Sequence, residues 1–275
     1  MSEITTKKVT TPFGDLVYYR TLEKKHEYNV IFIHGLGGSK EWFPDHYHMY
    51  SLDNFSWIVP DLMGYGNSAK PRKKHAYTME QQATYLLQVL REEKVKSLVI
   101  IAHSMGGPIA ISLIEQMQTK QKNQDQPWPI PICLFYLEGN LDKGDTFFSS
   151  QIARKSLEKY ESGFQSWCDK LLGQTNEESL IDWVNYLRQI GPFPLWASSQ
   201  DLVSVSVSNK LLPKLLKLIN FPVFFVYGER NKGLFSSEKL ILQASLPLIF
   251  LPDSGHTMLR DNPRALWRFI QEKLH

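Results

Sequence analysis

Residues 102–107 read Ala-His-Ser-Met-Gly-Gly and are the most informative short stretch of the chain. They follow an apolar run of strand length, residues 98–102, and open a helical pattern over residues 104–118. A serine at a strand-to-helix turn needs small neighbours, because the two backbones approach closely, and the helix N-terminus behind it favours negative charge. Ala102 is small enough for this. The stretch predicts a nucleophile elbow that carries Ser104, and the alternative is a serine that only caps its helix.

A glycine-rich loop follows an earlier apolar run. Residues 29–33 are β-rich, and residues 34–39 after them read His-Gly-Leu-Gly-Gly-Ser. The exposed backbone N–H groups of such a loop can face a reacting carbonyl. We expect the N–H groups of Leu36 and Met105 to form an oxyanion hole, and the alternative is an ordinary tight turn.

Short apolar runs alternate with helical patterns through most of the chain. Strands are predicted at residues 29–33, 57–60, 98–102, 132–138, 222–227 and 247–251, and helices at residues 39–50, 78–94, 104–118, 262–274 and from residue 236. The central runs carry no internal charge, as strands covered on both faces must. Near the N-terminus, residues 9–13 and 16–19 flank Gly14 and Asp15, which predicts an antiparallel hairpin. The pattern indicates an α/β protein with a mostly parallel sheet.

A helical insertion interrupts this rhythm. From residue 141 to residue 217, helical periodicity dominates and no central strand is evident. We therefore expect three segments: a first core part at residues 1–140, a helical cap at 141–217 and a second core part at 218–275.

Aromatic residues are interspersed through the predicted cap. They suggest an apolar pocket for a small-molecule substrate, and Phe147, Trp167 and Trp196 are the candidates to line it. The alternative is that they pack against one another, because aromatic residues at helical core spacing are more often part of a core.

Composition limits the classes of function. The 275 residues include 31 basic and 28 acidic side chains, so the charge balance does not call for a nucleic acid. Cys133 and Cys168 are too few for a disulfide framework or a cysteine zinc site and favour a reducing compartment. The N-terminal residues lack the apolar core of a signal peptide, and the longest apolar runs have strand length. We expect a cytoplasmic protein without stable membrane insertion, and the sequence makes no prediction of its oligomeric state.

The motifs, taken in order, resemble those of the α/β-hydrolase fold family over nearly the whole chain. Four features carry the resemblance: the loop at residues 34–39, the turn Asp-Leu-Met-Gly-Tyr-Gly-Asn-Ser at residues 61–68, the elbow at residues 102–107, and Gly255-His256 after the last strand. The resemblance implies a mostly parallel central sheet with helices on both faces and a helical cap over the site. It also implies that His256 is the general base. No metal ion or organic cofactor is implied.

The remaining histidines are not expected to act in catalysis. His34 and His103 adjoin the predicted loop and nucleophile, where the family places structural or supporting residues, and the others have no motif around them.

The acid of the expected triad does not stand at its usual position. Many family members carry an aspartate a few residues beyond the strand that corresponds to residues 222–227, and this chain has Asn231 there. In branches that resemble the haloalkane dehalogenases, a glutamate at the end of the preceding strand replaces it. Glu138 stands at that point, after six residues without a charge, and is costly to bury without a partner. Glu138 is therefore the preferred acid. The other candidates for the acid are Glu229, Asp142 and Asp253. The non-catalytic alternative for Glu138 is a salt bridge at the end of the strand.

A serine at the nucleophile position favours acyl transfer over the alkyl-enzyme chemistry that an aspartate performs. Ser104 would attack an ester or thioester carbonyl, and His256 would carry the proton to the leaving alcohol. We expect a serine hydrolase for a small to medium apolar ester. One alternative is a hydrolase of a carbon–carbon bond in a diketone-like metabolite, as in some capped family members. The other is a ligand-binding protein with little turnover, which Asn231 in place of an aspartate supports.

Overall fold

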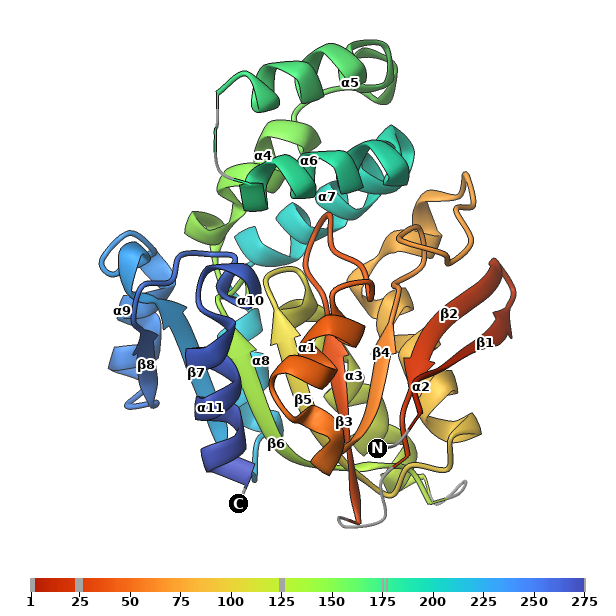
Figure 1. Ribbon diagram of the computed structural model, residues 1–275, viewed down its shortest axis with the longest axis vertical. Coiled ribbons are helices and arrows are strands. Elements are labelled where there is room, and N and C mark those ends of the chain that lie inside the picture. Colours follow the sequence, from red (N-terminus) through yellow and green to blue (C-terminus); the bar gives the residue numbers. More distant parts are fainter. Residues whose placement is uncertain (1–2, 23–26, 124–126, 175, 177, 275) are drawn as a thin grey trace.

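The computed structural model describes residues 3–22, 27–123, 127–174, 176 and 178–274. His26 and His275, two of the histidines without a surrounding motif, lie outside these ranges. An eight-stranded sheet runs through the molecule in the order β1-β2-β4-β3-β5-β6-β7-β8 (Figure 1).

The sheet is mostly parallel, as predicted. Its strands are β1 (Thr5–Thr11), β2 (Gly14–Arg20), β3 (Tyr28–Ile33), β4 (Ser56–Pro60), β5 (Ser97–His103), β6 (Ile130–Leu137), β7 (Val223–Gly228) and β8 (Leu248–Leu251). Strand β2 pairs antiparallel with β1 and with β4, and the pairings from β3–β4 to β7–β8 are parallel. The N-terminal hairpin and the predicted central strands are confirmed, with ends that shift by a few residues.

Helices cover both faces of the sheet (Figure 1). The first face carries α1 (Phe43–Met49) and α11 (Pro263–Leu274), and the second carries α2 (Met79–Glu92), α3 (Gly106–Lys122) and α8 (Leu211–Leu218). Along β3, Val30 and Phe32 belong to the apolar cluster under Trp267 of α11, while Ile31 and Ile33 belong to the cluster under α2 and α3. Because alternate residues of a strand face opposite sides, a strand covered twice must be apolar throughout.

Helix α1 begins at Phe43, four residues later than predicted. Lys40 is instead held by Asp61 in the turn after β4: its backbone N–H donates to Asp61 Oδ1 at 2.7 Å and its Nζ lies 2.9 Å from Oδ2. Both side chains are fully buried, so each charge depends on the other. This pair ties the loop after β3 to the turn at residues 61–68.

Four helices lie beyond the carboxyl ends of the strands (Figure 1). They are α4 (Phe147–Ala153), α5 (Leu157–Leu172), α6 (Glu178–Ile190) and α7 (Pro192–Val207), and no strand occurs among the described residues between 141 and 217. Helix α8 falls in the same predicted segment but packs on α3, where Gln118 donates to the carbonyl oxygen of Leu218 at 2.6 Å. The division of the chain into core and cap stays a prediction.

Among the described residues, no helix combines the length and the apolar character that a bilayer crossing requires.

Candidate active site

Ser104 lies in a strained turn between β5 and α3. Its φ is +54°, a value that residues with side chains rarely adopt. The Ser104 N–H donates to the carbonyl oxygen of Leu137 at 3.0 Å, and its carbonyl accepts from Gly107 N–H at 2.9 Å. Helix α3 therefore begins at Gly106, two residues later than predicted, and its N-terminus has no side-chain cap. The alternative that Ser104 only caps this helix is wrong.

One glycine in the elbow and one in the neighbouring loop make this turn possible. A Cβ at Gly106 would lie 2.3 Å from the carbonyl oxygen of Ile33, and a Cβ at Gly35 would lie 2.8 Å from the Cβ of Ser104. Both separations are shorter than real contacts, so the close approach of the elbow to β3 and to the glycine-rich loop requires these glycines.

The loop at residues 34–39, named here the glycine loop, forms a type II turn beside Ser104. Gly38 N–H donates to the carbonyl oxygen of Gly35 at 3.0 Å, which closes the turn. Gly37, its third residue, has a φ of +79°, whereas Leu36, its second, has no positive φ. This combination defines a type II turn, which needs a glycine at the third position.

The ring of His34 fixes the first peptide of this turn. Its Nδ1 donates to the carbonyl oxygen of Gly35 at 2.8 Å, and its Nε2 accepts from the Leu62 N–H at 3.0 Å. One nitrogen donates and the other accepts, so the ring is neutral, and burial lowers the pKa of His34. Because the C=O and N–H of one trans peptide point in opposite directions, holding the Gly35 oxygen also sets where the Leu36 N–H points. His34 is thus a structural residue, as expected.

The two predicted oxyanion donors have free backbone N–H groups. Within the described ranges, neither the Leu36 N–H nor the Met105 N–H donates to another residue. Leu36 lines the cavity that contains Ser104, and Met105 follows the serine directly. The arrangement is compatible with both donors facing a carbonyl oxygen bound at Ser104.

Glu138 and His256 are brought together at the ends of β6 and of the loop after β8. His256 Nδ1 donates to Glu138 Oε2 at 2.7 Å, and the glutamate side chain is 1% exposed. Burial alone would raise the pKa of Glu138, but the hydrogen bond and charge of His256, with bonds from Gly228 and Asn231, lower it below the ordinary value. Glu138 is the one carboxylate hydrogen-bonded to His256 among the described residues.

Asn231 has a role that the sequence did not reveal. Its Nδ2 donates to both oxygens of Glu138 at 3.0 Å, and the Gly228 N–H donates to Oε1 at 2.7 Å. Asn231, at the position where the resemblance places an aspartate, therefore holds the carboxylate of Glu138, the acid predicted from the neighbouring strand. The signal that could have predicted this contact is an amide at the position where the resemblance places an aspartate, because a buried carboxylate on the neighbouring strand needs hydrogen-bond donors.

His103 supports the backbone of His256. Its Nε2 donates to the carbonyl oxygen of His256 at 2.7 Å, and the centroids of the two rings are 4.8 Å apart. Burial, with a smaller contribution from the neighbouring His256, lowers the pKa of His103 to about 3. His103 is therefore neutral near pH 7 and holds its neighbour without adding charge to the site.

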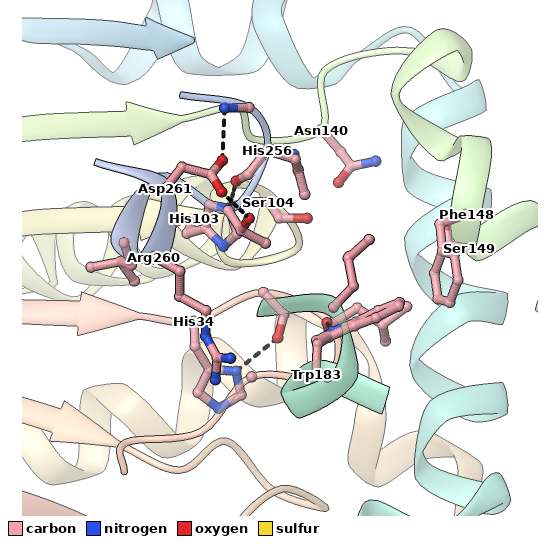
Figure 2. A pocket seen from close by; sticks show the side chains of 18 of the residues that line it. His34, His103, Ser104, Asn140, Phe148, Ser149, Trp183, His256, Arg260 and Asp261 are labelled. Carbon is pink, nitrogen blue, oxygen red and sulfur yellow. Dashed lines mark hydrogen bonds between the residues drawn. The ribbon is translucent and has the colours of Figure 1, made fainter. Parts of the chain in front are cut away.

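A cavity of about 620 Å³ opens over these residues (Figure 2). Ser104 and His256 line it at one side, and Trp183 and Phe148 project into it from α6 and α4. Its apolar wall includes Phe32, Leu36, Trp42, Phe147, Phe148, Leu180, Trp183, Tyr186, Leu202, Phe235 and Leu259, and its polar groups include Asn140, Ser149, Arg230, Arg260 and Asp261. The described residues include no cluster of three or more His, Cys, Asp or Glu suited to a metal ion.

Only one of the three cap aromatics expected in the pocket is found there. Phe147 lines the cavity, but Trp167 and Trp196 do not. Trp167 packs among aromatic residues of α4 and α5, with ring centroids 5.6 Å from those of Phe148 and Tyr160. Trp196 instead donates its Nε1 to the carbonyl oxygen of Lys155 at 2.9 Å. Trp167 thus packs between helices, and Trp196 contacts the segment between α4 and α5, so both agree with the alternative that they pack against other parts of the protein.

Comparison with known proteins agrees with this geometry. Residues 28–121 match the model of the α/β hydrolase fold family. Lipase 1 of Psychrobacter immobilis is 31% identical over 274 residues, which cover 93% of this chain and 79% of the lipase. Lipase 3 of Moraxella sp. (strain TA144) is 23% identical and covers 93% of this chain and 80% of its own length.

A solved structure shows the same fold. An esterase from Exiguobacterium antarcticum superposes with a TM-score of 0.73 at 16% sequence identity, over 98% of this chain and 99% of the esterase. With the sheet order, the strained serine turn and the similarity to Lipase 1, this establishes that the chain belongs to the α/β-hydrolase fold family, among its enzymes of the esterase and lipase type.

Proposed function

We propose that this enzyme hydrolyses carboxylic esters or thioesters of small to medium apolar substrates through an acyl-enzyme on Ser104. The observation that carries the proposal is the 2.7 Å hydrogen bond from His256 Nδ1 to the buried Glu138. Because the proton of the neutral ring lies on Nδ1, Nε2 is left to accept the proton of a serine hydroxyl.

The reaction follows from these groups. Ser104 Oγ attacks the substrate carbonyl while His256 takes the hydroxyl proton, and the carbonyl oxygen becomes negatively charged. The N–H groups of Leu36 and Met105 stabilise that oxygen, each by about 2.7 to 4 kcal/mol. His256 then gives its proton to the leaving alcohol or thiol. A water molecule attacks the acyl-enzyme in the same manner and releases the carboxylic acid.

Glu138 acts through the charge of His256. Its pKa is lowered, so it is ionised at neutral pH and stabilises the imidazolium that forms in each step. The bonds from Gly228 and Asn231 keep the carboxylate in place while that charge appears and disappears. A histidine paired in this way argues against the alternative of a ligand-binding protein with little turnover.

The pocket supports the proposed substrate class. We propose that α4 to α7 form the cap, since they supply Phe147, Phe148, Trp183 and other apolar wall residues. A cavity of about 620 Å³ falls within the range of roughly 300 to 1,000 Å³ that is usual for small-molecule sites. It can bury an acyl chain or an aryl group next to Ser104.

Hydrolysis of a p-nitrophenyl ester series tests the proposal. We expect turnover by the unaltered protein and loss of activity to near the background rate in Ser104→Ala. Ser149→Ala is the matched control, because this serine lines the same cavity and, among the described residues, its hydroxyl donates a hydrogen bond only to the carbonyl oxygen of Thr146. Unchanged hydrolysis in Ser104→Ala would refute the mechanism. Turnover of a diketone with no turnover of esters would favour the carbon–carbon bond alternative.

A further inference from the structure

A cap tryptophan is hydrogen-bonded to the glycine loop. Trp183 Nε1, from α6, donates to the carbonyl oxygen of Leu36 at 3.1 Å. The contact is close, because a Cβ at Gly37 would lie 2.3 Å from this Nε1 and 2.7 Å from Leu187 Cδ2. Figure 2 shows Trp183 on the side of the pocket away from His256. Helix α6 therefore rests directly on the loop that carries a proposed oxyanion donor.

Trp183 contacts the peptide whose orientation the turn's own hydrogen bond does not fix. The Leu36–Gly37 peptide is the central peptide of the turn, and its rotation by about 180° converts a type II turn into a type I turn. That rotation would exchange the sides on which the Leu36 oxygen and the Gly37 N–H lie. Glycine tolerates both conformations. The preceding peptide does not share this freedom, since the core donors His34 Nδ1 and Gly38 N–H hold the Gly35 oxygen.

We propose that Trp183 is a positioning residue, whose indole N–H holds the Leu36–Gly37 peptide in the orientation that keeps a carbonyl oxygen away from the developing oxyanion. The inference rests on the proposed function, because it assumes that the Leu36 N–H stabilises that oxyanion. His34 and Gly38 hold the peptide before Leu36, and Trp183 of α6 holds the peptide after it. The oxyanion hole is therefore complete only when α6 is seated on the loop.

A second contact fastens the same turn of α6 to the other side of the site. Arg260, in α10 (Met258–Asp261), lies 2.9 Å from Asp182 Oδ2 through its Nη1, and its guanidinium lies 5.8 Å from the ring centre of Tyr186. Asp182 precedes Trp183, and α10 begins two residues after His256. Helix α6 thus contacts both the glycine loop and the segment that carries the general base.

The substitution Trp183→Phe tests the inference, because it keeps a ring in the wall and removes the N–H. We expect kcat to fall about tenfold, which corresponds to about 1.4 kcal/mol of lost transition-state stabilisation and is within the range of one hydrogen bond, with little change in KM. An interaction that acts mainly in the transition state affects kcat in this way. The affinity for a boronic acid, which forms a tetrahedral adduct with the serine, should fall by a similar factor. A residue that only shapes the pocket would change KM instead.

Trp196→Phe is the matched control. It removes an indole hydrogen bond to a backbone carbonyl in the same group of helices, but Trp196 does not line the cavity. We expect its kcat and boronic acid affinity to equal those of the unaltered enzyme. If Trp183→Phe fails to fold, Asp182→Asn replaces it: the aspartate side chain is 54% exposed and does not line the cavity, and the substitution weakens the ion pair through which Arg260 holds α6. Its kcat should also fall at constant KM.

The failure of this inference can be told apart from failure of the proposed function. Fluorophosphonate labelling of Ser104 together with an unchanged kcat in Trp183→Phe, or a loss confined to KM, would overturn the positioning role and leave the ester hydrolase intact. Where Trp183→Phe is unfolded, an unchanged kcat in Asp182→Asn has the same meaning. Ester hydrolysis that persists in Ser104→Ala would overturn both.

Discussion

The substitution Glu138→Gln changes one oxygen of the buried carboxylate into an amide nitrogen with almost no change in volume. Three donors surround the carboxylate: Gly228 N–H at Oε1, His256 Nδ1 at Oε2, and Asn231 Nδ2 at both oxygens. A glutamine can present its oxygen to only one side. The structure therefore allows two orientations of the new amide, and each has a definite consequence.

In the first orientation, the glutamine oxygen faces His256 and its NH₂ group faces the Gly228 N–H. Two donors then oppose each other at a contact that is 2.7 Å long in the native enzyme, which leaves a buried donor unsatisfied at a cost of about 1 to 3 kcal/mol. In the second orientation, the glutamine oxygen accepts from Gly228 and the NH₂ donates to His256 Nδ1. The second orientation avoids that opposition and should predominate.

The second orientation inactivates the general base. If Nδ1 accepts a hydrogen bond, the proton of the neutral His256 ring must lie on Nε2, which then cannot accept the proton of Ser104. We expect kcat to fall by about 10⁴-fold, the scale known for loss of a triad acid. Activity should be measured with a p-nitrophenyl ester and folding by thermal unfolding.

Glu229→Gln is the control, because Glu229 is exposed on the short helix after β7 and should tolerate the same chemical change. A large loss of kcat in Glu229→Gln with none in Glu138→Gln would show that the acid has been assigned to the wrong residue.

The pH dependence of stability should also reflect the ionisation of Glu138. Since the pKa of Glu138 is lowered from its ordinary value of 4.5, its contribution to stability is fully present above that value and is lost as the pH falls through the folded-state pKa. The difference in free energy of unfolding between Glu138→Gln and the native enzyme should therefore narrow in acid. A difference in free energy of unfolding that stays constant as the pH falls below the folded-state pKa would contradict the lowered pKa of Glu138.

Three further predictions concern the elbow, the amide and a second, half-buried acid. Gly106→Ala should destabilise the fold by about 3 kcal/mol in urea unfolding, because its Cβ would meet a backbone oxygen at 2.3 Å; Gly163→Ala, with nothing within 4 Å, should stabilise it by about 0.5 to 1 kcal/mol. Asn231→Ala should lower kcat about tenfold, since Glu138 loses its amide donor; unaltered kinetics would show that this donor is dispensable. Burial raises the pKa of Asp145 from 3.8 to about 6, so the folded state holds its proton more tightly and stability should decline as the pH rises between these values. Asp145→Asn should lack that decline, and an identical pH dependence in the variant would contradict the raised pKa.

The sheet could be predicted because its physical demands are local. Strands such as β3 and β5 are covered on both faces, so each is a run without charge that the sequence displays directly. The elbow could be predicted because the apolar strand, the serine and the small residues follow one another directly in the sequence, although the contact that requires Gly106 is with the carbonyl oxygen of Ile33 in β3. The start of α1 was misplaced because Lys40 is held by Asp61, which lies 21 residues further on.

The site was harder to predict where contacts cross the fold. Asn231 and Glu138 are separated by 93 positions, and only the pairing of β6 with β7 brings them together. In the predicted cap, periodicity identifies apolar faces but not the surfaces that they meet. Trp167 and Trp183 have similar surroundings in the sequence, yet the first packs among helices and the second contacts the glycine loop.

Fluorophosphonate labelling tests the central claim most directly, because the reagent reacts with serines activated as the proposal requires. The purified enzyme should gain one adduct per chain by intact-mass spectrometry, and the modified peptide should map to Ser104. Ser104→Ala should gain none, and Glu138→Gln should react far more slowly. An adduct on another residue, or an unlabelled enzyme that still hydrolyses esters, would contradict the assignment of Ser104 as the nucleophile.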